Sequence, residues 1–211
     1  MLVRTLQETE NNANISEEIP LDNGIQITRL PGFDSSKKIL IYIPGYKENV
    51  FYESIHLIVN AYLKRGDTNV IVLDWSGYST RDYVTAMVTC VTEVPRVADV
   101  IKQMVDKGIP LENFHIMGHS LGAQCAGLQR GDAEFVHIIH TDRGLYGTAR
   151  TCGDFDVFFN NNGYRFQTGC PCVLVPIIFT FREETAILKR MAKLHLEKDS
   201  WEQDTHVETF L

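Results

Sequence analysis

The sequence predicts an α/β fold with a largely parallel sheet and flanking helices. Apolar runs of strand length recur along the chain, and segments with apolar residues at helical spacing separate them. The resulting order is strand, helix, strand, helix, strand, helix, strand, which is typical of a parallel sheet with crossover helices. The four runs that predict the principal strands span residues 39–43, 69–75, 114–117 and 135–139.

Length, composition and charge narrow the class of protein. A chain of 211 residues, 44% hydrophobic and 22% charged, can bury one substantial core. The net charge of -7 and the lack of a Lys/Arg cluster argue against a nucleic-acid partner. No apolar run is long enough for a transmembrane segment, and residues 1–10 lack the basic start and apolar stretch of a signal peptide.

The N-terminal part is polar before it becomes strand-like. Residues 1–18 are rich in Asn and Glu without periodicity, and we expect a flexible arm there. A turn is predicted at Asp22-Asn23-Gly24, and alternating apolar residues predict a half-buried strand over 25–30. The next strand, 39–43, is apolar at both parities and stops at Pro44-Gly45, as suits a strand covered on both faces.

Helical spacing then alternates with further strands. A helix is predicted over 51–64 with Gly66 as its C-terminal stop, and the strand 69–75 follows. A polar loop over 76–81 leads into a long helical pattern over 83–105, which Pro95 should kink or divide because proline removes a backbone donor. After the strand 114–117, a helix is predicted over 121–129 and a strand over 135–139.

The run Gly118-His119-Ser120-Leu121-Gly122 has the pattern G-x-S-x-G at the end of a predicted strand. A serine on a sharp turn between strand and helix projects its hydroxyl clear of both elements, and the two glycines let them approach closely. Without its flanks the pattern is also compatible with an ordinary Gly/Ser loop. The strand before it and the helix after it favour a nucleophile at the carboxyl end of a central strand, where open α/β sheets place their ligand sites.

The five cysteines are an odd number, so any disulfide set leaves one thiol. Cys90 and Cys125 lie among apolar neighbours and are predicted to be buried free thiols. Cys152 and Cys170 flank a polar segment and could close a disulfide loop. The cysteine spacing fits no zinc signature, so we predict neither a metal nor another cofactor.

Several blocks resemble the pancreatic-lipase-like family, which includes animal neutral lipases, venom phospholipases and non-catalytic insect yolk proteins. The resemblance covers about residues 25–172, and its blocks occur in the family's order. It implies an α/β-hydrolase fold, a carboxylic-ester substrate and usually secretion. The matching segments are Ile-Tyr-Ile-Pro-Gly-Tyr at 41–46, Val-Ile-Val-Leu-Asp-Trp-Ser-Gly at 70–77, His-Ile-Met-Gly-His-Ser-Leu-Gly-Ala-Gln at 115–124, Phe-Val-His-Ile-Ile-His-Thr-Asp at 135–142, and Asp-Phe-Asp-Val-Phe-Phe-Asn-Asn at 154–161.

Three residues are carried over from the family's active site. By resemblance, Ser120 is the nucleophile, and the backbone N–H of Leu121 is one donor to the oxyanion that forms on the ester. Tyr46 matches the position of the second donor, although an ordinary aromatic residue at a strand end is an equal interpretation.

The chain also departs from the family. The family's acid-bearing strand, which ends in Gly-Leu-Asp-Pro, has no counterpart before Phe135, so we expect one family strand to be missing. No Cys-x-His follows Cys170, so neither the lid nor the catalytic histidine is carried over. These gaps suggest a truncated, alternatively spliced or mispredicted product. The unpaired strand edges that a missing strand would leave predict moderate to poor stability.

The remaining residues offer an incomplete triad. If the strand 135–139 moved into the vacant place, Asp142 would stand near the position of the acid; the alternative is a structural role. His195, on a predicted amphipathic helix, and His206, in a polar tail, are the histidines in the right order for a base, but both are expected to be non-catalytic. The histidines expected to be structural are His115, His119 and His137, whereas His56 and His140 have no assigned role.

The predicted organisation is an arm over 1–18, a lipase-like domain over 19–172 and a divergent strand-helix-tail over 173–211. Two functions stay open. One is a lipase-type carboxylic-ester hydrolase that forms an acyl-enzyme on Ser120. The other is an inactive lipase-like protein that binds or stores lipid. The expected partner is therefore a lipid ester substrate or a bound lipid, with a lipid-water interface as a candidate surface, and the resemblance implies an extracellular location.

Overall fold

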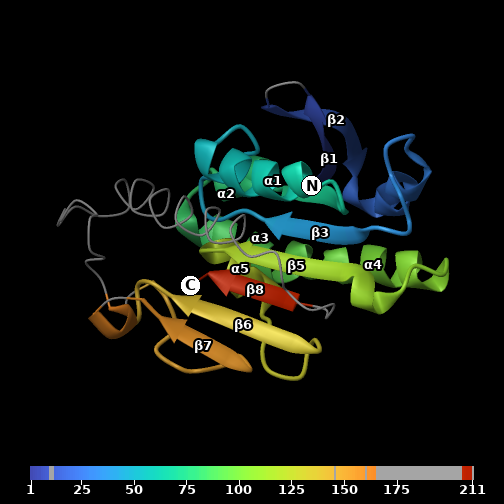
Figure 1. Ribbon diagram of the computed structural model, residues 1–211. Helices are drawn as coiled ribbons and strands as arrows, with labels where there is room; N and C mark the ends of the chain where they lie inside the picture. The colour runs from blue at the N-terminus through green and yellow to red at the C-terminus, as the bar shows by residue number, and fades with distance from the viewer. Residues whose placement is uncertain (10–11, 145, 160, 165–205, 211) are drawn as a thin grey trace.

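A mixed sheet forms the centre of the protein in the computed structural model, which describes residues 1–9, 12–144, 146–159, 161–164 and 206–210 (Figure 1). Its strand order is β2-β1-β4-β3-β5-β8-β6-β7. The strands from β4 to β7 in that order are parallel, while β1 pairs antiparallel with both β2 and β4. Their bounds are β1 (Leu2–Thr9), β2 (Asn12–Pro20), β3 (Lys38–Ile43), β4 (Thr68–Asp74), β5 (Phe114–His119), β6 (Phe135–His140), β7 (Phe155–Phe158) and β8 (His206–Phe210).

Helices flank this sheet, which confirms the predicted α/β class at the level of a mixed sheet with flanking helices. In the described part of the chain, no helix has both the length and the apolar character needed to cross a membrane. The α-helices are α1 (Glu53–Arg65), α2 (Ser76–Ser79), α3 (Tyr83–Glu93), α4 (Val97–Asp106) and α5 (Leu121–Ala126), and the 3-10 segments are η1 (Leu21–Arg29), η2 (Val94–Arg96), η3 (Leu111–Asn113) and η4 (Asn161–Gly163).

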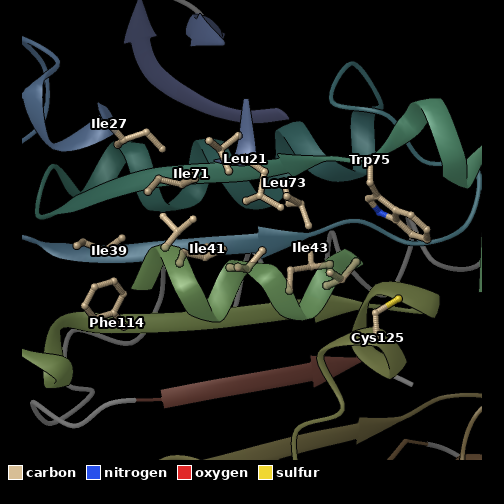
Figure 2. Packing of buried hydrophobic residues seen from close by; sticks show 14 of the residues in the cluster. Leu21, Ile27, Ile39, Ile41, Ile43, Ile71, Leu73, Trp75, Phe114 and Cys125 are labelled. Carbon is tan, nitrogen blue, oxygen red and sulfur yellow. The ribbon is translucent and has the colours of Figure 1, made fainter. Parts of the chain in front are cut away.

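Both faces of the central strands are buried. Successive side chains of a strand point to opposite faces, so Ile39, Ile41 and Ile43 of β3 enter one cluster (Figure 2), and Leu40 and Tyr42 enter another. The first cluster packs under η1, α3, α4 and α5, and the second packs under α1. This confirms the prediction from the apolar run at 39–43, because a strand covered on both faces needs apolar residues at both parities.

The N-terminal residues are not a loose arm. Residues 1–18 lie largely within the β1–β2 hairpin, which extends the sheet by pairing with β4. Val3 and Leu6 of β1 are buried and enter opposite clusters, so these two residues do not form one apolar face. Arg4 adds an ion pair with Asp74 at 2.6 Å.

The strand predicted over 25–30 is wrong, because these residues belong mostly to the 3-10 segment η1. Leu21, Gly24 and Ile27 are its buried residues, and their three-residue spacing matches the 3-10 repeat. Gly24 lets η1 pack closely against α4, since a Cβ at Gly24 would lie 2.8 Å from a methyl carbon of Val100.

Other element boundaries follow the expected signals. Gly66 ends α1 in the left-handed conformation, with φ of 72°. Pro95 lies in η2, which divides the predicted long helix into α3 and α4. Helix α5 is shorter than predicted and ends before Gly127, another left-handed residue, with φ of 62°.

Strand β8 lies between β5 and β6 and is parallel to both. The premise that the strand 135–139 moves beside the nucleophile strand is therefore wrong, because the C-terminal strand takes that place. It also covers the edge of β5 that a missing family strand would leave unpaired. The proposed domain boundary at residue 172 and the expected helix that contains His195 lie outside the described residues.

Candidate active site

Ser120 lies on a sharp turn between β5 and α5, at the carboxyl edge of the sheet. Its backbone has φ of 51° and ψ of -123°, a region that residues with a side chain rarely adopt. Strained backbone of this kind persists only when the surrounding structure enforces it. The geometry is that of the strand-turn-helix predicted from G-x-S-x-G.

The two glycines of the motif are required by backbone proximity. A Cβ on Gly118 would lie 2.5 Å from the Cα of Ala123, so the strand and the helix touch at this point. A Cβ on Gly122 would lie 2.3 Å from the carbonyl oxygens of Ile43 and Pro44. The start of α5 is thus pressed against the end of β3, where no side chain fits between them.

The loop after β3 packs on the serine turn. A Cβ on Gly45 would lie 3.0 Å from the Cβ of Ser120. The Trp75 indole donates a hydrogen bond to the carbonyl oxygen of Pro44 at 2.8 Å and fixes the loop from the side of β4. Gly45 and the strained turn are therefore in direct contact.

Two backbone N–H groups in this region are candidate oxyanion donors. Leu121 is the first residue of α5, so its N–H has no partner within the helix. Tyr46 follows Gly45, and among the described residues its N–H has no hydrogen-bond partner. The Tyr46 hydroxyl donates to the Arg81 carbonyl, and its ring lies edge-on to Tyr83, with 5.1 Å between the ring centroids.

Beneath this loop, the buried carboxylate of Glu48 accepts hydrogen bonds from three segments. The donors are the Gly45 N–H at 2.6 Å, the Ser54 hydroxyl at 2.9 Å and His119 Nδ1 at 2.8 Å. Burial alone would raise the pKa of Glu48, but the charge of His119 and the hydrogen bonds from His119, Gly45 and Ser54 together lower it. A buried carboxylate is thereby held in its charged form next to the serine turn.

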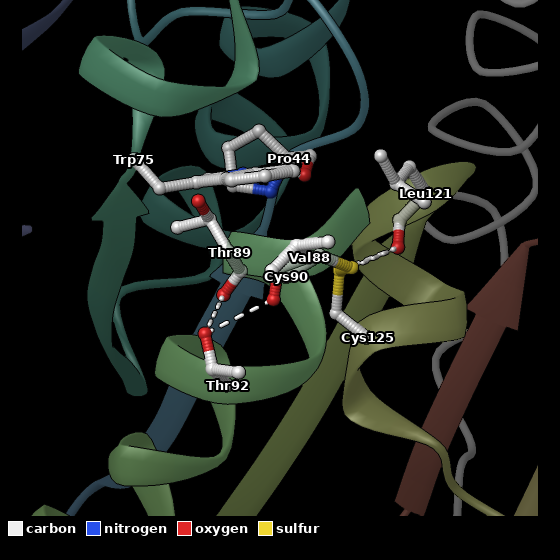
Figure 3. The surroundings of a disulfide bond; sticks show 8 residues. All are labelled: Pro44, Trp75, Val88, Thr89, Cys90, Thr92, Leu121 and Cys125. Atoms are coloured by element: carbon white, nitrogen blue, oxygen red, sulfur yellow. Dashed lines mark hydrogen bonds between the residues drawn. A yellow bond between two sulfur atoms is a disulfide. The ribbon is translucent and has the colours of Figure 1, made fainter. Parts of the chain in front are cut away.

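A disulfide joins Cys90 of α3 to Cys125 of α5 behind the same turn (Figure 3). The prediction of two free thiols is wrong, although both residues are buried as predicted. Their sulfur atoms lie 3.5 and 2.8 Å from the Leu121 carbonyl oxygen, so the bond links α5 to α3 close to the residue that follows Ser120. Cys152 is a free thiol, against the predicted loop with Cys170, and Cys170 lies outside the described residues.

Asp142 does not reach the position on which its catalytic prediction rested. It follows β6, and β8 separates β6 from the nucleophile strand. Two strand spacings amount to about 10 Å. The nearby buried pair is instead His140 with Asp156, at 2.6 Å between Nε2 and Oδ1, and it joins β6 to β7.

No histidine is brought to the serine hydroxyl in the part of the chain that the structure describes. His119 is bonded to Glu48, His140 to Asp156 and His115 to the Tyr62 hydroxyl. His206 begins β8 in register with Phe135, at the edge of the sheet opposite Ser120. The described residues also contain no group of three or more His, Cys, Asp or Glu placed to hold a metal ion.

Comparison with known proteins places this site in a family. The profile of the family described as Lipase matches residues 2–129, more than half of the chain and all of the serine turn. The chain belongs to the lipase family. This confirms the resemblance to pancreatic-lipase-like proteins.

Individual relatives of this lipase-family chain are distant and longer. Lipase member H-A of Xenopus laevis is 28% identical over an alignment of 209 residues. That alignment covers 80% of this chain and 43% of the relative. Lipoprotein lipase of Gallus gallus is 30% identical over 178 residues (65% and 36%), and phospholipase A1 member A of Rattus norvegicus is 28% identical over 151 residues (57% and 33%). The chain thus spans less than half the length of these relatives.

Among solved structures, a phospholipase/carboxylesterase from Dyadobacter fermentans aligns with a TM-score of 0.35 and 14% identity, over 85% of this chain and 84% of its own. That similarity is too weak to support an argument.

The sequence pattern predicted the turn at Ser120 but gave no sign of the buried Glu48 or of the disulfide. Glu48 stands in the polar triplet Lys47-Glu48-Asn49, which has the composition of an exposed loop. Its burial depends on donors 6 and 71 residues away in the chain, which no local pattern reveals. Cys90 and Cys125 are 35 residues apart, and their apolar surroundings predict burial without indicating a partner.

Proposed function

We propose that this chain is a carboxylic-ester hydrolase of the lipase type, with an α/β-hydrolase fold and a lipid ester as its substrate. The observation that carries the proposal is the strained Ser120 turn, packed against the loop that presents Tyr46. Membership of the lipase family supports the substrate class.

In the proposed reaction, Ser120 Oγ bonds to the carbonyl carbon of the ester, and negative charge develops on the carbonyl oxygen. The N–H groups of Tyr46 and Leu121 stabilise that charge, and each such preorganised donor typically lowers the barrier by about 3 kcal/mol. The alcohol then leaves with a proton, and water hydrolyses the acyl-enzyme to release the fatty acid. A base must carry the proton from Ser120 to the alcohol.

The alternative is a catalytically inactive lipase-like protein that binds or stores lipid. A specific observation favours it: among the described residues, no histidine is hydrogen-bonded to the Ser120 hydroxyl, and β8 separates Asp142 from β5. A serine hydroxyl without a base is a poor nucleophile.

A fluorophosphonate probe separates the two functions, because it labels only an activated serine. The hydrolase proposal predicts labelling of the folded protein and turnover of a short-chain p-nitrophenyl ester, both abolished by Ser120→Ala. A folded protein that is neither labelled nor active would remove the hydrolase proposal. Lipid binding by that inert protein would then support the alternative.

We further propose that the protein works outside the cell at a lipid-water interface. The Cys90–Cys125 disulfide supports the location, since such bonds persist in oxidising compartments. The outer face of α3 supports the interface, because Val84, Val88 and Val91 are 63, 54 and 61% exposed and Glu93 is the only charged residue of the helix.

Flotation with phosphatidylcholine vesicles tests the interface. Replacing Val84, Val88 and Val91 with serine should lower vesicle binding several-fold, whereas Leu111→Ser, an equally exposed residue before β5 at the opposite edge of the sheet, should not. Equal binding by both variants would contradict this surface.

A further inference from the structure

We propose that Glu48, through its contacts with Gly45 and His119, is a positioning residue that sets the distance between the two oxyanion donors. The inference rests on the proposed hydrolase function. Glu48 lies outside the G-x-S-x-G motif. Its buried ionic contact joins the loop that carries Tyr46, called the donor loop below, to the serine turn.

The geometry places Glu48 at the junction of the two donor segments. One carboxylate oxygen, Oε2, accepts both from the Gly45 N–H, one residue before Tyr46, and from His119 Nδ1, one residue before Ser120. The position of that oxygen therefore sets how the loop that carries Tyr46 lies relative to the turn that carries Leu121. The other oxygen, Oε1, accepts from Ser54 in the first turn of α1 and anchors the carboxylate to the helix.

The loop backbone is held in addition to the side chain. Lys47 takes a left-handed φ of 61°, and its N–H donates to the Ser79 carbonyl at 3.0 Å. The Ser79 hydroxyl donates to the Glu48 carbonyl at 3.3 Å. The loop is thus fixed on both sides of Glu48, so its carboxylate is directed inward.

Burying the charge of Glu48 is costly, so its hydrogen bonds to Gly45 and His119 must offset that cost. Glu48 is 1% exposed, and a buried carboxylate is tolerated only when it is paired and hydrogen-bonded. Apolar residues would fill the same space at lower cost, but they have no acceptor for the Gly45 N–H or His119. The buried carboxylate therefore fixes the positions of Gly45 and His119, which an apolar side chain could not do.

Asp74 offers a matched control. It is also a buried carboxylate at the carboxyl end of a strand, and it accepts from the Ser76 N–H and pairs with Arg4. None of these partners belongs to the donor loop or the serine turn. Asp74→Asn thus reproduces the loss of a buried, hydrogen-bonded charge without touching the donors.

The experiment compares Glu48→Gln with Asp74→Asn in p-nitrophenyl ester hydrolysis. Glu48→Gln should lower kcat about 10- to 100-fold, because a misplacement of about 1 Å costs up to that much, while KM changes less than about twofold. Asp74→Asn should leave kcat within about twofold of the parent. His119→Gln should lower kcat similarly, and the double variant should lose little more than either single one. Equal kcat losses in Glu48→Gln and Asp74→Asn would overturn the proposal.

Two further measurements keep the test decisive. Amide hydrogen exchange should accelerate in Glu48→Gln and not in Asp74→Asn at two hydrogen-bonded amides, Gly45 in the donor loop, whose N–H donates to Glu48, and Ala123 after the serine turn, whose N–H donates to the Ser120 carbonyl. This readout needs no activity. If the parent protein fails to react with fluorophosphonate, the hydrolase function fails, and unchanged exchange is then what would overturn the positioning role. If Glu48→Gln does not fold, Ser54→Ala removes one donor and keeps the charge, and an unchanged kcat or exchange rate in that variant would refute the proposal.

Discussion

At the scale of single residues, the conformation of the serine turn is determined by close contacts between backbone segments. Ser120 is the proposed nucleophile, and its strained turn lies where α5 starts directly against the end of β3. Gly118, Gly122 and Gly45 are the positions where strand, helix and loop touch without a side chain between them. The geometry of the serine turn therefore depends on three glycines.

Gly122→Ala tests that dependence. The added Cβ would meet the carbonyl oxygens of Ile43 and Pro44 at 2.3 Å. Neither can move away easily, because Ile43 ends the central strand β3 and the Pro44 carbonyl is held by the Trp75 indole. We expect a loss of about 3 kcal/mol of stability, which corresponds to a fall of about 10 °C in Tm for a domain of this size. Thermal unfolding followed by circular dichroism measures the change.

Gly77→Ala is the matched control for Gly122→Ala. Gly77 lies in α2, and no heavy atom lies within 4 Å of the added Cβ. The Tm of the Gly77→Ala variant should therefore stay within about 2 °C of that of the parent protein. A similar fall in both variants would show that the close approach at Gly122 is not the cause.

The pKa of Glu48 makes a prediction for stability against pH. Folding lowers this pKa, so the charged carboxylate stabilises the folded state above its unfolded pKa of about 4.3. That contribution is lost as the pH falls below about 4 toward the folded pKa. Urea titrations from pH 7 to pH 3 should therefore show a smaller loss of unfolding free energy in Glu48→Gln than in the parent. Parallel curves would contradict a lowered pKa.

Residue-level prediction from sequence succeeded where the signal was local. Gly118, Ser120 and Gly122 lie within five consecutive positions, so their spacing, with the strand pattern before it and the helical pattern after it, indicates the turn. A catalytic role of Asp142 requires β6 to lie beside β5, and no local pattern shows that β8 lies between them. Glu48 had no local signal, since its partner His119 is 71 residues away.

At the scale of elements, the Cys90–Cys125 disulfide fixes α3 against the nucleophile helix. Replacing both cysteines with alanine should lower the unfolding free energy by about 2–4 kcal/mol, because the bond closes a loop with a sequence separation of 35 residues. Chemical denaturation without reductant measures the change. Cys152→Ala, at a half-buried free thiol, should cost much less, and an equal cost would argue against a role for the bond.

Element types were predictable where the local sequence carries a strong signal for one kind of element. The strands β3 and β4, the helix α1 and the break at Pro95 follow apolar runs, helical spacing and a proline. The hairpin β1–β2 and the segment η1 were missed because the local sequence does not show which other elements they pack against. Of the hairpin side chains that the structure describes, Val3 and Ile19 enter one cluster and Leu6 the other. Tertiary pairing, with β4 for the hairpin and with α4 for η1, decided their conformations.

At the scale of the whole molecule, the order of strands is the property that local patterns predict least. The central pairs β3–β4 and β3–β5 join segments of the predicted strand-helix series. The next position in the sheet is filled by β8, from the far end of the chain, although the lipase family resemblance indicates a missing strand there. A parallel strand between two others supplies backbone hydrogen bonds to both, so the sheet from β4 to β7 is continuous.

This continuity makes β8 essential for folding, and Thr209→Pro tests it. Thr209 pairs with Gly118 of β5 on one side and with Ile138 of β6 on the other, so it lies within the ladders of an interior strand. Proline removes an N–H from the ladder and is found essentially only on edge strands, so the variant should lose about 3 kcal/mol or more. Thr209→Val keeps the N–H and the side-chain shape, and should melt near the parent. If Thr209→Pro retained the parent's Tm and cooperative unfolding, β8 would not be the strand that joins β5 to β6, and the edge of the nucleophile strand would be open.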